Sequence, residues 1–125
     1  MSTVSILVVD DDPDSRNLLE LALSLEGYAV RSAADGAAGL MSARLFPPDV
    51  ILLDLAMPVM DGFAFRAAQL DDPVLVHIPV ICVSGRHDAD EAARAMKLAG
   101  CVGKPFALDE IVVRIRDITD ATARN

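Results

Sequence analysis

The sequence contains no tryptophan, one tyrosine and four phenylalanines, so aromatic side chains can fill little of a hydrophobic core. Hydrophobic residues nevertheless make up 53% of the chain, which argues against disorder and leaves aliphatic side chains to form the interior. A chain of 125 residues has the size of one ordinary domain. We therefore expect a single domain, residues 1–125, around an aliphatic core.

Positive charge is scarce. Eleven Lys and Arg residues stand against nineteen Asp and Glu residues, which gives a formal net charge of −8. Such a surface repels phosphate backbones and anionic lipid headgroups. We expect neither direct nucleic acid binding nor association with a membrane.

Long apolar runs are also missing. Residues 50–53 form one of the longest, far short of the roughly 20 residues of a membrane helix, and residues 1–5 lack the pattern of a signal peptide. The sequence thus predicts a cytoplasmic location. The only two cysteines, Cys82 and Cys101, do not have metal-binding spacing, and we expect reduced thiols within the core.

Five short apolar segments alternate with five segments of helical character. The expected strands are residues 4–9, 28–33, 50–53, 79–83 and 101–104. The expected helices span about 13–25, 36–46, 63–70, 88–99 and 108–122. Strands that are apolar on both faces need cover on both sides, which predicts an α/β fold with a doubly wound parallel sheet.

Capping residues and helical spacing define the expected helix ends and faces. Asp12 and Asp35 are expected N-caps, Pro13 a first helical residue, and Gly27 a left-handed cap. Expected apolar faces are Leu18, Leu21, Ala22 and Leu25 in the first helix, Ala37, Leu40, Met41 and Leu45 in the second, and Leu108, Ile111, Ile115 and Ile118 in the last. Val113 is expected to point away from the last of these faces.

Polar residues stand where the expected strands end. Asp10 and Asp11 follow the first strand, Asp54 the third, Ser84 the fourth, and Lys104 closes the fifth. In doubly wound sheets the carboxyl ends of the strands form the ligand site. Three carboxylates gathered there would repel one another unless a cation is bound. Oxygen ligands favour Mg²⁺, with Mn²⁺ as a substitute.

A magnesium site of this kind suits phosphoryl chemistry. Asp54 is the best candidate nucleophile, because a carboxylate can accept a phosphoryl group as an acyl phosphate. Ser84 offers a hydroxyl donor and Lys104 a positive charge to the phosphoryl oxygen atoms. Gly85, without a side chain, leaves space for a bulky donor.

Several of these segments, in this order, are similar to a known family. They are Ile6-Leu7-Val8-Val9-Asp10-Asp11, Asp54-Leu55-Ala56-Met57-Pro58 with Asp61-Gly62, Val83-Ser84-Gly85 and Lys104-Pro105-Phe106. The whole chain resembles a receiver domain of a two-component response regulator. The resemblance implies a flavodoxin-like fold with strand order 2-1-3-4-5 and five flanking helices.

The resemblance also implies a role for each site residue. Asp54 would be the phosphoacceptor, and Asp10 and Asp11 would hold Mg²⁺ together with the main-chain carbonyl of Ala56. Ser84 and Lys104 would bind the phosphoryl oxygens.

The implied phosphoryl donor is a sensor histidine kinase or a histidine phosphotransfer protein. The implied output is a conformational change that controls a downstream protein or a fused output domain. The domain would catalyse only its own phosphorylation and dephosphorylation.

The sequence departs from the family pattern near the fifth strand. Cys101 occupies the position of the family's switch aromatic, and the connection from Gly100 to Lys104 is about three residues shorter than usual. We therefore expect the response to phosphorylation to be a movement of residues 84–91 and 102–108 that does not depend on an aromatic side chain.

Three other functions are considered. A Mg²⁺-dependent phosphohydrolase with an aspartyl nucleophile would need a second acid two residues after Asp54, where Ala56 stands. A nucleotide-binding domain would need a glycine-rich turn after the first strand, where three acids stand instead. A receiver-like adaptor that is not phosphorylated would not need the acids, Ser84 and Lys104 together.

Overall fold

The structure is a computed structural model that describes residues 3–54, 62–84, 91, 94–103 and 107–123. Its strands are β1 (Ser5–Val9), β2 (Ala29–Ala33), β3 (Val50–Asp54), β4 (Val80–Ser84) and β5 (Gly100–Gly103). The helices with described bounds are α1 (Pro13–Leu25), α2 (Gly36–Leu45), α3 (Gly62–Leu70) and α5 (Leu108–Ala123). The expected elements are present within a residue or two of their predicted limits, except for the fourth helix.

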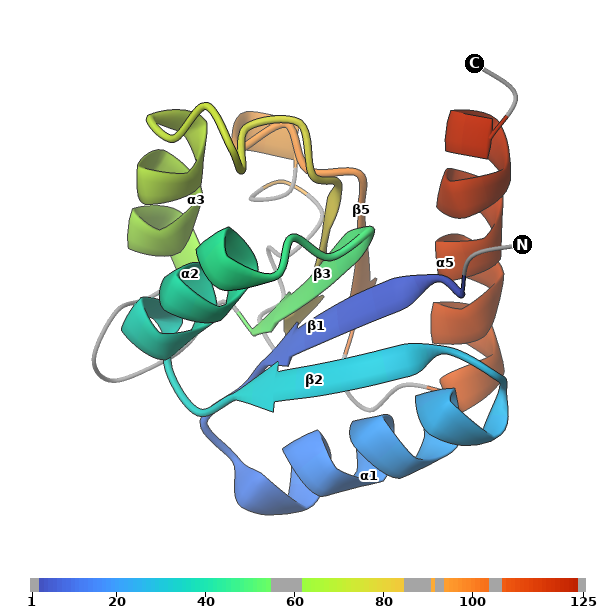
Figure 1. The fold of residues 1–125 in the computed structure, drawn as a ribbon. Coiled ribbons are helices and arrows are strands. Elements are labelled where there is room, and N and C mark those ends of the chain that lie inside the picture. The colour runs from blue at the N-terminus through green and yellow to red at the C-terminus, as the bar shows by residue number, and fades with distance from the viewer. Residues whose placement is uncertain (1–2, 55–61, 85–90, 92–93, 104–106, 124–125) are drawn as a thin grey trace.

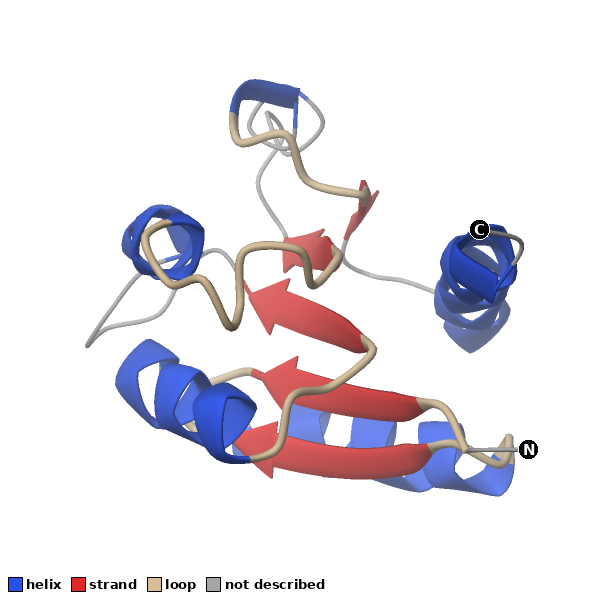
Figure 2. Cartoon of the chain, turned by 45° about the horizontal axis from the view of Figure 1, so that its top comes forward, coloured by secondary structure: helices blue, strands red, loops and turns tan. Residues whose placement is uncertain are grey.

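The five strands form one parallel sheet in the order β2-β1-β3-β4-β5 (Figure 2), which confirms the expected fold class. β1 and β3 are direct neighbours, with Val9 opposite Leu53. The carboxyl ends of β1 and β3 therefore lie side by side at one edge of the sheet, and this position determines where the polar residues that follow them meet.

Helices cover both faces of the sheet (Figure 1). Alternate residues of one strand enter different cores, since Ile6 and Val8 pack with α1 and α5, whereas Leu7 and Val9 pack with α2 and α3. This alternation explains why the strands are continuous apolar runs. Most buried side chains are aliphatic, and Phe65 is the one aromatic side chain buried among the described residues.

The N-caps are those predicted. The Asp12 side chain accepts a hydrogen bond from the main-chain N–H of Asp14 at 3.1 Å, and Pro13 begins α1. The Asp35 side chain accepts from the N–H of Ala38 at 2.8 Å at the start of α2. Gly27 has the left-handed conformation expected after α1, with φ of 96°.

The predicted apolar face of α1 is wrong. Leu19 and Leu23 are buried, whereas Leu18, Leu21 and Leu25 are 50%, 61% and 79% exposed. Leucines at these five positions allow two stripes with helical spacing, and the helix's own sequence does not decide between them. The connection from β1 through Asp12 and Pro13 sets the rotation of the helix about its axis. In this rotation Leu19 and Leu23 face the sheet.

The predicted face of α2 is only partly correct. Leu40 is buried, but Met41 and Leu45 are 65% and 67% exposed. Gly39 faces the sheet instead, so closely that a Cβ atom there would lie 2.9 Å from a methyl group of Val9. The absence of a side chain at Gly39 lets α2 approach β1 closely. A pattern of hydrophobic residues alone does not predict that a glycine will face the sheet.

The last helix has the predicted face. Ile111 and Ile115 are fully buried, and Leu108 and Ile118 are partly buried against the same core. Val113 is 50% exposed, as expected from its position on the helix.

The chain between β4 and β5 differs from the prediction of one helix over residues 88–99. Residues 85–90 and 92–93 lie outside the described part, and the described helical residues end at Ala95. Lys97 adopts a left-handed conformation with φ of 55°, and Gly100 begins β5 instead of ending a helix. Arg66 of α3 donates hydrogen bonds to the main-chain oxygens of Met96 and Lys97, each at 3.0 Å.

The prediction of reduced cysteines is wrong, because Cys82 and Cys101 form a disulfide. They lie directly opposite each other in the register of β4 and β5, with Cα atoms 4.5 Å apart. That separation is within the range that a disulfide spans. The two cysteines are 19 residues apart in the sequence, and the pairing of β4 with β5 brings them together. Nothing in the local sequence indicates this pairing.

Candidate functional site

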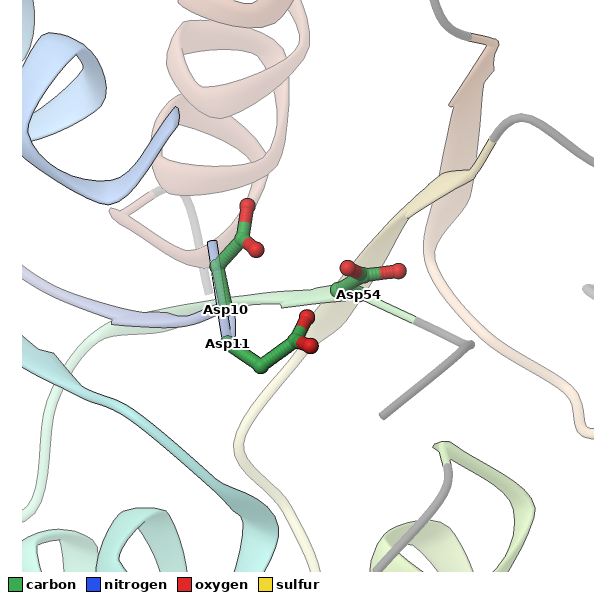
Figure 3. Close-up of side chains that lie close together, drawn as sticks. All are labelled: Asp10, Asp11 and Asp54. Atoms are coloured by element: carbon green, nitrogen blue, oxygen red, sulfur yellow. The ribbon is translucent and has the colours of Figure 1, made fainter. Parts of the chain in front are cut away.

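Three acids converge at the carboxyl ends of two neighbouring strands (Figure 3). Asp10 and Asp11 follow β1, and Asp54 is the last residue of β3. Each of the three offers a carboxylate oxygen, and these oxygen atoms lie within 4.8 Å of one another. The structure thus brings together the three acids that the sequence singled out.

The surroundings of the three acids differ. The residues Asp10 and Asp54 are 3% and 7% exposed, whereas Asp11 is exposed to solvent. In Figure 3 the Asp11 carboxylate points toward that of Asp54. The cluster therefore has two carboxylates at the edge of the core and one that a solvated ion or donor can reach.

Hydrogen bonds hold the turn after β1 in place. The Asp10 carboxylate accepts from the main-chain N–H of Asp12 at 2.9 Å, and the N–H of Asp10 donates to the carbonyl of Ala33 at 3.1 Å. The Arg16 guanidinium donates to the main-chain oxygen of Asp10 at 2.9 Å. Sequence reasoning missed Arg16, whose only signal is its place within the first helical turn after the acids.

A divalent cation fits this set of donors. The carboxylates provide only oxygen ligands, which hard cations prefer. Mg²⁺ binds oxygen at about 2.1 Å, so oxygens on opposite sides of one ion are about 4.2 Å apart. The carboxylate oxygens of the three acids lie within 4.8 Å of one another, so they are close enough to bind one such ion. A cation between the acids would also relieve the repulsion of three like charges in a partly buried place.

The other predicted site residues are less fully placed. Ser84 is the last residue of β4, paired in register with Gly103 of β5. Its backbone is therefore at the same edge of the sheet as Asp54, since Asp54 is paired with Val83. Ala56 and Lys104 lie outside the described residues, as does Gly85.

Among the described residues, no helix has both the length and the apolar character needed to cross a membrane.

Comparison with known proteins gives a consistent result. A family model described as response regulator receiver domain matches residues 6–116. The transcriptional regulatory protein PrrA of Mycobacterium tuberculosis is 41% identical over 118 residues, which are 89% of this chain and 48% of PrrA. The response regulator PleD of Caulobacter vibrioides is 35% identical over 116 residues, 91% of this chain and 26% of PleD.

A solved structure matches over nearly its whole length. Chemotaxis protein CheY4 of Vibrio cholerae superposes with a TM-score of 0.86 at 28% identity, covering 94% of this chain and 99% of CheY4. The chain thus spans about half the length of PrrA, and nearly all of CheY4.

Proposed function

Because this chain belongs to the response regulator receiver domain family of two-component systems, we propose that Asp54 is its phosphoacceptor. The observation that carries the proposal is the convergence of Asp10, Asp11 and Asp54 at the ends of β1 and β3. Asp54 sits on the inner of these strands in the sheet, with the acid pair beside it. The neighbouring strand, β1, thus places two further carboxylates beside the proposed nucleophile.

The proposed reaction transfers one phosphoryl group. A carboxylate oxygen of Asp54 attacks phosphorus, and the bond from phosphorus to the donor breaks. That bond is to an imidazole nitrogen in a phosphohistidine, or to an oxygen in acetyl phosphate. The electron pair leaves with the donor, which takes up a proton from water if it needs one, and an acyl phosphate remains on Asp54.

Asp10, Asp11 and Asp54 would hold Mg²⁺, together with the main-chain carbonyl of Ala56, and Mn²⁺ could replace it. When bound, the ion would neutralise charge as the phosphoryl dianion approaches a carboxylate. The buried Asp10 carboxylate is fixed by the N–H of Asp12, so one ligand is positioned before any ion binds. Ser84 and Lys104 are proposed to bind the phosphoryl oxygen atoms.

The proposed partners are a sensor histidine kinase or a histidine phosphotransfer protein, and a downstream protein or fused output domain. PrrA, a transcriptional regulatory protein, and PleD are both longer than this chain, which supports an output domain in a longer protein. Residues 1–125 are proposed to act as one cytoplasmic receiver domain. With a net charge of −8, this domain would not itself bind nucleic acid.

The proposed domain is not an enzyme beyond catalysing its own phosphoryl transfer and autodephosphorylation. Ala56 cannot supply the general acid that a phosphohydrolase with an aspartyl nucleophile needs. An adaptor that is not phosphorylated would gain nothing from three carboxylates held against one another, because their repulsion opposes folding.

Intact mass measurement after incubation with acetyl phosphate and Mg²⁺ tests the proposal. The wild-type chain should gain the mass of one phosphoryl group only when Mg²⁺ is present, and Asp54→Asn should gain none. Asp117→Asn is the matched control, because it makes the same chemical change on an exposed position of α5. A mass gain that persists in Asp54→Asn would show that another residue is the acceptor.

A further inference from the structure

The disulfide between Cys82 and Cys101 joins the two strands that lead to proposed phosphoryl-binding residues. Cys82 lies two residues before Ser84 in β4, and Cys101 lies three residues before Lys104, just beyond β5. We propose that this pair is a reversible redox modification site, opened and closed by exchange with low-molecular-weight thiols and disulfides. The further claim, that the redox state of this pair changes the response to phosphorylation, rests on the proposed function.

The geometry allows both redox states without rearrangement of the sheet. The two residues are direct partners in the register of β4 and β5, and their Cα atoms are 4.5 Å apart. Neighbouring strands of any sheet lie about 4.7 to 4.9 Å apart. The strand pairing itself, and not the disulfide, therefore holds the sulfur atoms close together, so two thiols remain positioned to close again.

The location of the pair makes its redox state matter. β5 is an edge strand of four residues with glycine at both ends, Gly100 and Gly103, and among the described strands its partner is β4. The disulfide closes a loop that runs from Cys82 to Cys101. This loop contains the whole connection between β4 and β5, so opening the bond leaves the pairing with β4 to hold β5 without a covalent link between the two strands.

A contact links the pair to the chain that precedes β5. Met96 and Leu98 are partly buried and pack against the two cysteines, and Leu98 also packs against the core formed with α2 and α3. Arg66 holds the main-chain oxygens of Met96 and Lys97 from the other side. Residues 96–98 are thus held by α3 through the Arg66 hydrogen bonds, and they also pack against the disulfide.

The exposure of the two cysteines sets the order of the exchange. Cys101 is 8% exposed and Cys82 is fully buried, so an external thiolate attacks the Cys101 sulfur. The first step forms a mixed disulfide at Cys101 and releases the Cys82 thiolate, which takes up a proton. A second external thiolate then attacks the external sulfur and releases the Cys101 thiolate, which is protonated in turn.

In sum, one protein disulfide and two external thiols give two protein thiols and one external disulfide. The reverse direction uses the same atoms. A Cys101 thiolate attacks an external disulfide, and Cys82 then displaces the second external thiol. Because an intramolecular partner is always opposite Cys101, closure is favoured over accumulation of the mixed disulfide.

The test equilibrates the chain with mixtures of reduced and oxidised glutathione, then counts alkylated cysteines by intact mass. The oxidised protein should take up no alkyl group and the reduced protein two, with the change reversed when the mixture is reversed. Two results would overturn the proposal. One is a disulfide that reduced glutathione never opens in the native protein, and the other is a pair of thiols that oxidised glutathione never converts to the disulfide.

Hydrogen exchange measures the consequence in the same mixtures, without any phosphoryl donor. Release of a loop of this length should make exchange at residues 94–103 on the order of tenfold to a hundredfold faster in the reduced protein. The double variant Cys82→Ala/Cys101→Ala, which has no thiol, should exchange like the reduced wild type in every mixture. Equal exchange of oxidised and reduced wild type would contradict the proposal.

A final arm adds acetyl phosphate and Mg²⁺ to both redox states. We expect the exchange change that accompanies phosphorylation of Asp54 to be larger at residues 94–103 in the reduced protein. An equal change in both states would refute the link to signalling. Failure of either state to gain phosphoryl mass would instead refute the proposed function, while the alkylation and donor-free exchange results would still decide the redox site.

Discussion

A single residue, Lys97, carries a backbone conformation that normally belongs to glycine. Its φ of 55° places it in the left-handed region, just after the helical residues that end at Ala95. For a residue with a Cβ atom this conformation costs about 1 kcal/mol. The cost is tolerated because Arg66 binds the carbonyl of Lys97 and so stabilises the turn.

Lys97→Gly should therefore stabilise the domain by about 0.5 to 1 kcal/mol, since glycine adopts this conformation without the steric cost. Urea unfolding of the wild type and the variant measures the difference. Lys97→Ala removes the same charge but keeps the Cβ atom, and it should bring no gain. If alanine stabilised the domain as much as glycine, the lysine charge and not the backbone would be responsible.

Gln69 is a buried polar residue whose hydrogen bonds are all made within the domain. Its amide nitrogen donates to the main-chain oxygens of Leu75 and Ile78 at 2.9 and 2.8 Å, and its amide oxygen accepts from Arg66 at 2.7 Å. Partial burial lowers the pKa of the Arg66 guanidinium by desolvation. Gln69 thus joins α3 to the segment that leads into β4.

Replacing Gln69 by methionine keeps a side chain of similar shape and removes all three hydrogen bonds. We expect Gln69→Met to lower the free energy of unfolding by about 1 to 3 kcal/mol, because the main-chain oxygens of Leu75 and Ile78 each lose the Gln69 donor, and the Leu75 oxygen keeps the N–H of Ile78. Gln69→Ala, which also leaves a cavity, should be less stable still. Equal stability of Gln69→Met and the wild type in urea unfolding would show that these hydrogen bonds contribute nothing net.

At the scale of elements, the packing of α2 on β1 depends on a glycine. A Cβ atom at Gly39 would lie 2.9 Å from Val9 Cγ2 and 3.3 Å from Phe65 Cε2. Alanine is the better helix former by about 1 kcal/mol, but overpacking of this kind costs about 1 to 3 kcal/mol. We expect the steric term to be the larger one, because Val9 is fully buried on a strand that is paired on both sides.

Gly39→Ala should accordingly reduce the free energy of unfolding by about 1 to 2 kcal/mol. A double-mutant cycle with Val9→Ala supplies the control, since the shorter side chain at position 9 removes the close contact. In that background Gly39→Ala should be neutral or stabilising. Additive effects of the two substitutions would mean that α2 does not depend on this contact.

The elements also show which parts of the fold the sequence can predict. The strands, the N-caps Asp12 and Asp35 and the left-handed Gly27 follow from local rules and were predicted correctly. The buried face of α1 was not, because Leu18 and Leu19 are equally apolar and the direction of the connection from β1 decides which one meets the sheet. Local patterns locate an element, whereas its rotation depends on neighbours distant in sequence.

At the scale of the whole molecule, the convergence of three acids could be predicted from the ends of the strands. Asp10, Asp11 and Asp54 meet because parallel strands have their carboxyl ends at one edge, a rule that needs no register. The disulfide between Cys82 and Cys101 needed the register of β4 on β5, which no local pattern contains. Arg16 was missed because it contacts a main-chain oxygen, and such a contact has no sequence signature.

The charge of the whole molecule leads to a prediction about metal binding. The chain carries a net charge of −8, and three of its acids lie within one cluster. A cation that binds only the folded state raises its stability by about 2.7 kcal/mol at one hundred times the dissociation constant. Millimolar Mg²⁺ or Mn²⁺ should therefore raise the thermal midpoint more than NaCl of equal ionic strength does.

Asp11→Asn should lose most of this gain, and without metal it should be more stable than the wild type because one of three repelling charges is removed. Asp117→Asn removes one negative charge as Asp11→Asn does, but it lies on α5, away from the cluster, and should keep the full gain. Thermal unfolding followed by circular dichroism compares the three proteins. An unchanged metal effect in Asp11→Asn would place the ion elsewhere.

The position of β1 between β2 and β3 has a further consequence for a chain made from its N-terminus. β1 pairs with β2 on one side and with β3 on the other, so the first 54 residues contain every strand that the three acids require. The helix α5, which covers one face of these strands through Ile111 and Ile115, is synthesised after them. During translation the emerging chain therefore carries the strands and the three acids before α5 is available to cover that face.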